Sequence, residues 1–172
     1  AREPAADAVL TTIAFGSCLK QKDPMPILAT LLETKPDLTI LLGDNVYGDV
    51  EDIEDPQIPE LRDAYATLAD RAEFQAPIRQ TPVLATWDDH DYGKNDLGKD
   101  LPVKEQAEEA FEGFWNVQEG DERLDRPGVY TAKTFGPAGQ RVQIILLDTR
   151  FFREGLTATD ERGAPGKERY VP

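Results

Sequence analysis

The sequence predicts an α/β fold: a layered β-sheet core with mostly parallel strands and flanking helices. Strand-like and helix-like segments alternate along most of the chain, an order typical of a parallel sheet covered by helices. Two apolar runs, Leu38–Leu42 and Pro82–Thr86, lack polar alternation, as expected of strands buried on both faces. The composition, with 40% hydrophobic and 30% charged residues, is that of a globular protein. No internal repeat or linker divides the chain before a polar tail, so we expect one domain.

The first three predicted elements are a strand, a helix and a second strand. Leu10–Phe15 is a short β-branched and apolar run that ends at Gly16. Pro26–Thr34 begins with proline and carries apolar residues at helical spacing, which predicts a helix. Leu38–Leu42 has the length of a strand and is closed by a Gly-Asp pair. Together these segments predict the first βαβ unit of the sheet.

The remaining elements continue the alternation and end in a hairpin. Pro59–Phe74 is predicted as one helix, Pro82–Thr86 as a buried strand and Lys104–Trp115 as an amphipathic helix. Val129–Phe135 and Arg141–Leu147 are expected to pair around a Gly-Pro-Ala-Gly turn. From residue 155 onward the chain is polar, rich in glycine, proline and charge, and without periodicity.

Composition and charge exclude several classes of protein. The net charge of −14 argues against general binding to nucleic acid, whose phosphates would be repelled. A phosphate-handling enzyme with this charge would need local positive charge, most simply from metal ions. No run approaches the roughly 18–20 apolar residues that span a bilayer. One cysteine allows no intrachain disulfide, and one histidine allows no site built from several histidines of this chain. The chain begins without Met, so removal of a leader and export stay open.

Side chains with metal-binding or catalytic chemistry follow the predicted strands. Cys18 follows the first strand, Asp44 and Tyr47 follow the second, and Asp89 and His90 follow the third. In a parallel sheet the carboxyl ends of the strands share one edge, where ligands gather. The order of elements therefore predicts that thiol, carboxylate, phenol and imidazole groups meet there.

Several of these residues also have an ordinary structural explanation. A lone cysteine at a strand end is usually a small buried hydrophobe, and the Gly-Asp-Asn around Asp44 favours turns. His90 could cap a helix or be hydrogen-bonded in the core. The Asp88–Asp91 block is harder to explain structurally, because its carboxylates repel one another unless a cation neutralises them. Hard cations prefer oxygen ligands, and thiolate or phenolate nearby favours a transition metal such as iron. We therefore predict a metal site.

Four segments together resemble the PhoD-like alkaline phosphatases, a branch of the metallophosphoesterases. They are Phe15–Cys18, Leu42–Asp49, Thr86–Asp96 and Leu147–Arg150. The specific part is the Trp-Asp-Asp-His block combined with Gly-Asp-x-x-Tyr. The resemblance implies hydrolysis of phosphomonoesters, and in some members phosphodiesters, by metal-activated hydroxide. It also implies an exported protein, periplasmic or secreted.

The resemblance implies a role for individual residues. Cys18, Asp44 and Tyr47 would hold Fe³⁺, with Asp44 bridging to a second metal. Asp89 would bind that second metal, Ca²⁺ in this family, with Mn²⁺ or Zn²⁺ as alternatives. His90 would stabilise the transition state or donate a proton to the leaving group. Candidates for substrate binding or for support of the ligands are Asn45, Asp88 and Asn95, and the role of Asp148 and Arg150 would be structural support or catalysis.

The sequence departs from the family in one respect. The family's further ligands lie in a later segment with Asp and His, whereas no histidine follows His90. We therefore expect residues 9–154 to be the N-terminal half of the catalytic domain, after an extension at 1–8. The polar residues 155–172 would be a flexible tail or a nicking loop. The partner would be the C-terminal half, as a second chain or a missing segment.

Two alternative functions stay open from the sequence. One is a non-catalytic module that binds metal or phosphate and retains half a site. The other is a calcium-binding domain that uses the Asp-rich loops and holds no iron. Loss of Cys18 would leave metal affinity unchanged in the calcium-binding domain and would remove iron in the phosphatase.

Overall fold

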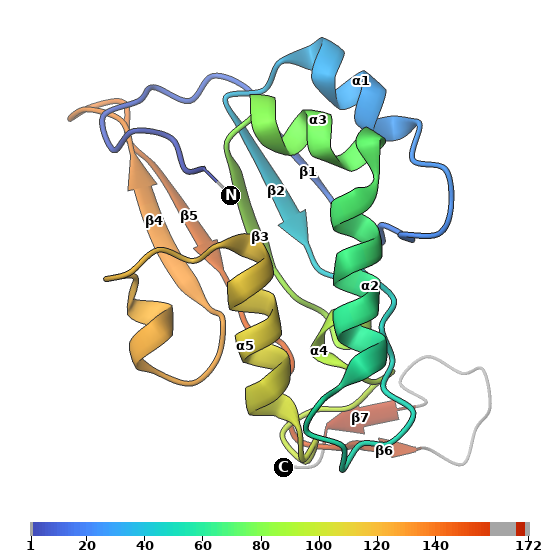
Figure 1. The fold of residues 1–172 in the computed structure, drawn as a ribbon. Coiled ribbons are helices and arrows are strands. Elements are labelled where there is room, and N and C mark those ends of the chain that lie inside the picture. The colour runs from blue at the N-terminus through green and yellow to red at the C-terminus, as the bar shows by residue number, and fades with distance from the viewer. Residues whose placement is uncertain (1, 159–167, 171–172) are drawn as a thin grey trace.

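The computed structural model describes residues 2–158 and 168–170. It contains three sheets, of which the largest is parallel, and helices that lie mainly on one side of it (Figure 1). In chain order the elements are β1 (Ile13–Gly16), α1 (Ile27–Thr34), β2 (Leu38–Leu42), α2 (Pro59–Asp70), α3 (Ala72–Gln80), β3 (Val83–Thr86), α4 (Asp89–Tyr92), α5 (Lys104–Trp115), the 3₁₀ helix η1 (Glu122–Asp125), β4 (Thr131–Phe135), β5 (Val142–Leu146), β6 (Leu156–Ala158) and β7 (Glu168–Tyr170).

The central sheet has the order β1-β2-β3 with all three strands parallel. Ile13 pairs with Leu38 and Thr39 with Val83, so the carboxyl ends of the strands reach the same edge. Beyond β3, the N–H of Val83 donates to the carbonyl of Arg2 at 2.9 Å, which places the N-terminal segment along that side of the sheet. The predicted α/β class with parallel strands is confirmed.

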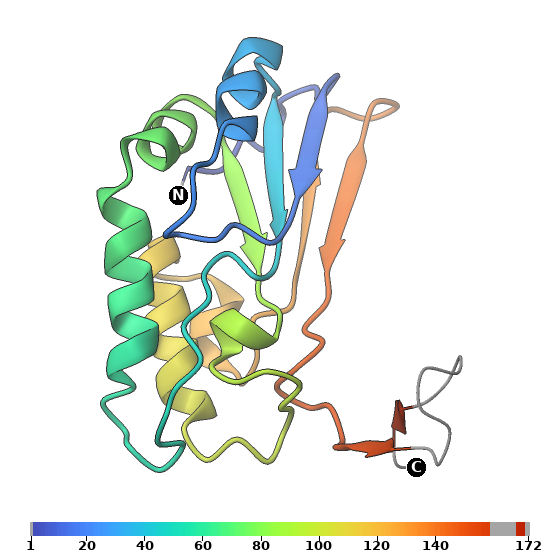
Figure 2. The same cartoon turned by 90° about the vertical axis from the view of Figure 1, so that its right-hand side faces the viewer.

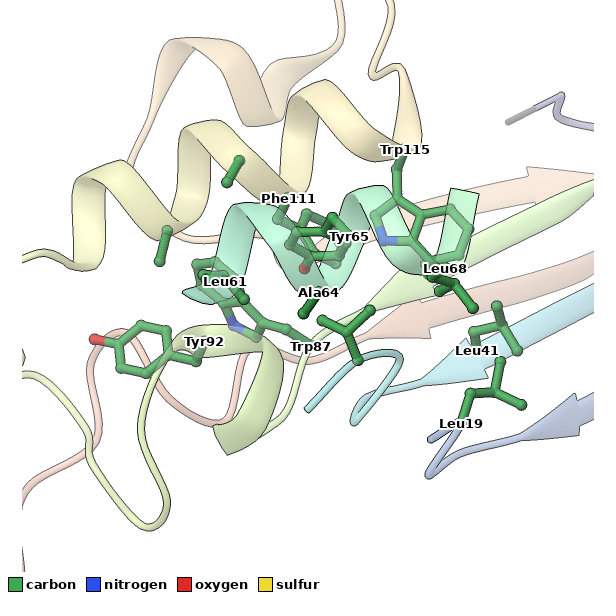
Figure 3. Close-up of a cluster of buried hydrophobic side chains, with 14 of the residues drawn as sticks. Leu19, Leu41, Leu61, Ala64, Tyr65, Leu68, Trp87, Tyr92, Phe111 and Trp115 are labelled. Carbon is green, nitrogen blue, oxygen red and sulfur yellow. The ribbon is translucent and has the colours of Figure 1, made fainter. Parts of the chain in front are cut away.

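The molecule has three layers, shown edge-on in Figure 2. The helices cover one face of the parallel sheet, and the antiparallel β4–β5 hairpin covers the other. The helix-side core centres on an aromatic cluster in which Trp87 packs edge-on against Tyr92 and Phe111, with ring centroids 5.0 and 5.4 Å away (Figure 3). The smaller core on the hairpin side consists of Leu38, Ile40, Leu84, Phe135 and Leu146.

Burial of the strands follows from this layering. All four residues of β3 and the first four of β2 are buried, as their continuous apolar pattern predicts. β1 is the edge strand, and Phe15 at its end is 74% exposed. β1 is also shorter than the predicted Leu10–Phe15, because the N–H groups of Thr11 and Thr12 donate to the Asp37 carboxylate.

The prediction of one helix over Pro59–Phe74 was wrong. Arg71 has an extended conformation that ends α2, and α3 begins at the next residue. The Arg71 guanidinium donates to the carbonyls of Gln21 and Asp23 at 3.0 Å and to Glu73, so tertiary contacts hold the break. Apolar periodicity alone does not reveal such a break.

Three other features went beyond the sequence prediction. The single turn α4 and the 3₁₀ helix η1 are too short to carry a periodic pattern. The tail contains β6 and β7, which pair antiparallel with Leu156 opposite Tyr170. Of the predicted flexible tail or nicking loop, residues 159–167 and 171–172 lie outside the described residues. Among the described residues, no helix combines the length and apolar character that crossing a membrane requires.

Candidate metal centre

The candidate site lies beyond the carboxyl ends of the central strands, where α4 follows β3 (Figure 1). The loops after β1 and β2 are held together, because the N–H of Cys18 donates to the Gly43 carbonyl and that of Leu19 to the Asp44 carbonyl. Cys18 and Asp44 both have left-handed backbones, with φ of 63° and 50°. Such conformations cost free energy in non-glycine residues and cluster at functional sites. Local strain thus coincides with two predicted ligands.

Cys18, Asp44 and Tyr47 meet at one carboxylate oxygen. Cys18 Sγ lies 3.6 Å and Tyr47 Oη 3.3 Å from Asp44 Oδ2. Asp44 Oδ1 is buried and has no hydrogen-bond partner within the described part of the chain. Burial raises the pKa of Asp44, and the neighbouring charges of Asp89 and Asp88 raise it further. Burial and the Asp44 charge likewise raise the pKa of Tyr47. The anionic forms of these groups disfavour one another and would be stabilised by a cation.

The third loop brings Asp89 and His90 to Asp44. Asp44, Asp89 and His90 each offer one ligand atom, and these atoms all lie within 4.8 Å of one another. Although burial opposes it, the N–H of Asp96, 2.9 Å from Asp89 Oδ2, and the Arg150 charge lower the pKa of Asp89. Asp89 is therefore held in the charged form that binds metals.

His90 is oriented by a carboxylate that the sequence analysis did not single out. His90 Nδ1 lies 2.7 Å from Asp49 Oδ2, and the Asn95 N–H donates to Asp49 Oδ1 at 2.6 Å. The Tyr47 ring lies against the imidazole, with centroids 4.3 Å apart. The second Gly-Asp pair of the Gly-Asp-Asn-Val-Tyr-Gly-Asp segment was the available sequence signal for Asp49.

Asp91 joins the two loops from within the core. Its side chain is fully buried and accepts hydrogen bonds from the N–H groups of Asp44, Asn45 and Asp88 and from Asn45 Nδ2. Burial raises the pKa of Asp91 to about 7. The Asn45 amide also donates to the Thr86 carbonyl at 2.8 Å. Asp91 and Asn45 therefore connect the Asp44 loop to the turn that carries Asp89 and His90.

Gly43 lets the same two loops approach each other. Its φ is +108°, and a Cβ built there would lie 2.5 Å from the backbone nitrogen of Asp88 and 2.6 Å from its Cβ. No other residue type fits this contact without a shift of the backbone.

Some of the residues predicted for the site meet at its surface, and the others lie beneath or beside it. Those brought together at the surface of the site are Cys18, Asp44, Tyr47, Asp89 and His90. Asn45 lies beneath them and is 1% exposed. Asp88 bonds to Arg150. Asn95 is exposed and its amide donates to Asp96 Oδ2 at 2.9 Å.

The donor set fits a metal centre. Carboxylate oxygens suit hard cations such as Ca²⁺, and a thiolate with a phenolate suits Fe³⁺. Asp44, which contacts these donors through Oδ2, has a second, buried oxygen without a hydrogen-bond partner among the described residues, Oδ1. Buried polar atoms are almost always paired, so this oxygen indicates a partner such as a cation.

Comparison with known proteins identifies the family and the fold of this chain. The sequence profile described as PhoD-like phosphatase matches residues 13–170. The chain belongs to the PhoD-like phosphatase family. The solved "Structure of PhoD" matches 89% of this PhoD-like chain with a TM-score of 0.67 and 21% sequence identity, which indicates the same fold. The PhoD-like chain spans only 34% of that solved chain. A comparison with curated proteins found no match.

Proposed function

We propose that this chain is the N-terminal half of the catalytic domain of a metal-dependent phosphoric ester hydrolase. Its substrates would be phosphomonoesters and a subset of phosphodiesters. The observation that carries the proposal is the meeting of Cys18, Tyr47, Asp89 and His90 around the carboxylate of Asp44. One oxygen of that carboxylate, Oδ1, is buried without a hydrogen-bond partner among the described residues. Family membership supports a phosphate ester as the substrate.

Two kinds of metal ion would be held by these residues. Cys18, Asp44 and Tyr47 would hold Fe³⁺, while Asp44 and Asp89 would contribute to a site for Ca²⁺, or alternatively Mn²⁺ or Zn²⁺. Bound metals would supply charge stabilisation for the phosphate oxygens and lower the pKa of water to give a nucleophile at neutral pH. They would also offset the net charge of −14 where the phosphate binds.

The protein's own residues would handle the proton of the leaving group. Asp49 fixes the His90 ring through Nδ1 at 2.7 Å, which leaves Nε2 for the substrate side. As the imidazolium, with both ring nitrogens protonated, the positioned ring would give its Nε2 proton to a departing alkoxide or stabilise charge on the phosphate. The Tyr47 ring against His90 limits its rotation.

The other half of the domain would complete the site. The chain spans 34% of the solved PhoD chain, which supports the absence of further ligands from this segment. Activity would therefore need the C-terminal half, as a second chain or as a further segment of the same protein. We also propose export to the periplasm or the medium, on the family resemblance.

Metal content tests the proposal directly. The purified chain is loaded anaerobically with iron and calcium, desalted, and analysed by native mass spectrometry and elemental analysis. We expect bound iron and calcium in the wild type, and loss of iron with retention of calcium in Cys18→Ser. Tyr130→Phe, at a tyrosine outside the site, is the matched control for Tyr47→Phe, which should also weaken iron binding.

Three outcomes would contradict the proposal. Calcium without iron in the wild type would favour the calcium-binding domain, and iron retained at full occupancy in Cys18→Ser would indicate an iron site that does not use Cys18. Metal binding without hydrolysis of 4-nitrophenyl phosphate, in a protein that includes the C-terminal half, would favour the non-catalytic module.

A further inference from the structure

The Asp148-Thr149-Arg150 segment lies next to the candidate metal centre and has no role in the proposed reaction. It follows β5, whose carboxyl end points to the same edge as those of the central strands (Figure 1). Asp148 accepts hydrogen bonds at 2.9 Å from the N–H groups of Val129, Arg150 and Phe151. Thr86 Oγ1 donates to the Leu147 carbonyl at 2.9 Å. The backbone that carries Arg150 is therefore fixed at the end of β3.

The side chain of Arg150 forms ion pairs with two aspartates next to the candidate metal centre. It is 10% exposed, and its Nε donates to Asp88 Oδ1. Its Nη2 lies 3.8 Å from Asp89 Oδ2. Thr149 Oγ1 donates to the same oxygen of Asp88 at 3.4 Å. A charge-assisted bond from a buried guanidinium is strong and directional, so Asp88 is oriented toward β5.

The hydrogen bond from Arg150 distinguishes Asp88 from the neighbouring carboxylates of Asp44 and Asp89. Asp44 and Asp89 offer oxygens that lie within 4.8 Å of each other and of a His90 nitrogen. Asp88 precedes Asp89 in sequence, and its charge still raises the pKa of Asp44, but it is not a member of that group in the described structure. The difference lies in how Arg150 contacts them: its Nε donates directly to Asp88, whereas its Nη2 stays 3.8 Å from Asp89. Asp44 Oδ1 has no hydrogen-bond partner in the described structure.

We propose that Arg150, assisted by Thr149, is a positioning residue that withholds Asp88 from the metal and so sets which carboxylates act as ligands. The inference rests on the proposed metal centre. Without Arg150, Asp88 would lose its ion-pair partner, and its carboxylate would be drawn from the cap of α4 toward the cation. A hard cation would then gain an oxygen ligand and lose a neighbouring positive charge, so it would bind more tightly and in a different geometry.

A double-mutant cycle with Mn²⁺ as the probe tests the proposal. Isothermal titration calorimetry gives the Kd of Mn²⁺ for wild type, Arg150→Met, Asp88→Asn and the double variant. We expect Asp88→Asn to change the wild-type Kd little. Arg150→Met should lower the Kd about tenfold, the order of effect of one unit charge near a partly exposed site. Asp88→Asn should then raise the Kd about tenfold in the Arg150→Met background.

Controls separate this role from simple support of the fold. Arg123→Met removes another buried arginine, paired with Asp121 at 2.9 Å, and should leave the Mn²⁺ Kd unchanged. Arg150→Lys keeps the charge without the planar fork and should give an intermediate Kd; it replaces Arg150→Met in the cycle if that variant does not fold. The Mn²⁺ electron paramagnetic resonance spectrum should change in Arg150→Met and return toward wild type in the double variant.

The outcomes are distinct. Equal effects of Asp88→Asn in both backgrounds would overturn the proposal, since a pure charge effect is additive. Weaker Mn²⁺ binding in Arg150→Met would also overturn it. Absence of Mn²⁺ binding to wild type would overturn both this inference and the proposed metal centre, whereas wild-type binding with an additive cycle would overturn this inference alone.

Discussion

At the scale of single residues, the site depends on hydrogen bonds that convert flexible carboxylates into fixed groups. Asp49 holds the imidazole of His90, and Asp91 holds the loop of Asp44 against the turn of Asp89. Neither Asp49 nor Asp91 binds a metal ion in our proposal, but each fixes the position of side chains that have a proposed role. The sequence motifs were enough to identify Asp44, Asp89 and His90 as candidate site residues. They did not show which of the other aspartates in the same motifs face inward, because that depends on contacts between loops 40 or more residues apart.

The pairing of Asp49 with His90 leads to a prediction about the imidazole tautomer. His90 is the chain's only histidine, so its ring nitrogens give an unambiguous ¹⁵N NMR signal. We expect the wild-type ring in its neutral form to carry its proton on Nδ1, donated to Asp49. Asp49→Asn supplies an amide that can donate in return, and should shift the population toward the Nε2–H tautomer. Asp52→Asn, at an exposed position, is the control; equal ¹⁵N shifts in Asp49→Asn and wild type would contradict the assigned role.

At the scale of elements, the sequence predicted the bounds of a strand or helix correctly where the residue pattern of that element is complete within its own segment. The bounds of β2 and α5 agree with the sequence prediction, because a continuous apolar run and an amphipathic period are complete within each segment. The break at Arg71 and the single turn α4 were missed, because each is stabilised by partners distant in sequence. Asp88 and Asp91 form a capping box that stabilises α4. In the sequence alone these residues are a run of acidic side chains, and their capping role becomes clear only from the tertiary contacts.

The junction after β2 leads to a prediction for Gly43. Gly43→Ala would force a left-handed backbone on alanine and drive its Cβ into Asp88. We expect it to lower the free energy of unfolding by about 3 kcal/mol or more, by combining strain with overpacking. Gly139→Ala is a matched control, since Gly139 also has a positive φ, +87°, but has open space around it. It should cost about 1 kcal/mol from backbone strain alone. Urea unfolding measures both, and equal losses would show that the close approach to Asp88 is unimportant.

At the scale of the whole molecule, the sequence predicted a parallel sheet and its functional edge but not the second layer. The hairpin was expected as an element, and its position over the face of the sheet opposite the helices was not. That position follows from the smaller core, in which Phe135 and Leu146 meet Leu38 and Leu84. Nothing local in the hairpin specifies this contact. It brings Arg150 to Asp88, so the least predictable part of the fold also completes the surroundings of the site.

Glu108 connects α5 to the hairpin and predicts a pH dependence of stability. Burial raises its pKa to about 7, although the N–H of Gly128 donates to it. The folded state therefore binds a proton that the unfolded state releases near pH 4.5, so stability falls as pH rises from about 4.5 through about 7. Glu108→Gln keeps an acceptor without the charge and should be more stable than wild type at pH 8, on the order of 1 kcal/mol because the group is only partly buried. Glu109→Gln, on an exposed neighbour, should show no gain in thermal melts; the same response in both variants would contradict the prediction.

The outer face of the hairpin predicts how the chain behaves without the rest of its domain. Ile145 is 62% and Leu147 66% exposed, while Leu146 between them is 4% exposed and faces the smaller core. Tyr130 and Phe152 border a hollow beside these two residues. Monomeric proteins rarely expose a large contiguous apolar patch, so we expect the C-terminal half of the proposed catalytic domain to cover this face.

We therefore expect the isolated chain to self-associate in sedimentation velocity experiments. Ile145→Lys combined with Leu147→Lys should shift it toward monomer, because charge at the centre of the patch opposes its burial. Ile27→Lys, at an apolar residue 64% exposed elsewhere on the surface, should have no such effect. Added C-terminal half should suppress self-association of the wild type and fail to bind the double-lysine variant. A wild-type chain that stays monomeric at high concentration would mean that this face needs no cover, and the position proposed for the second half would then be wrong.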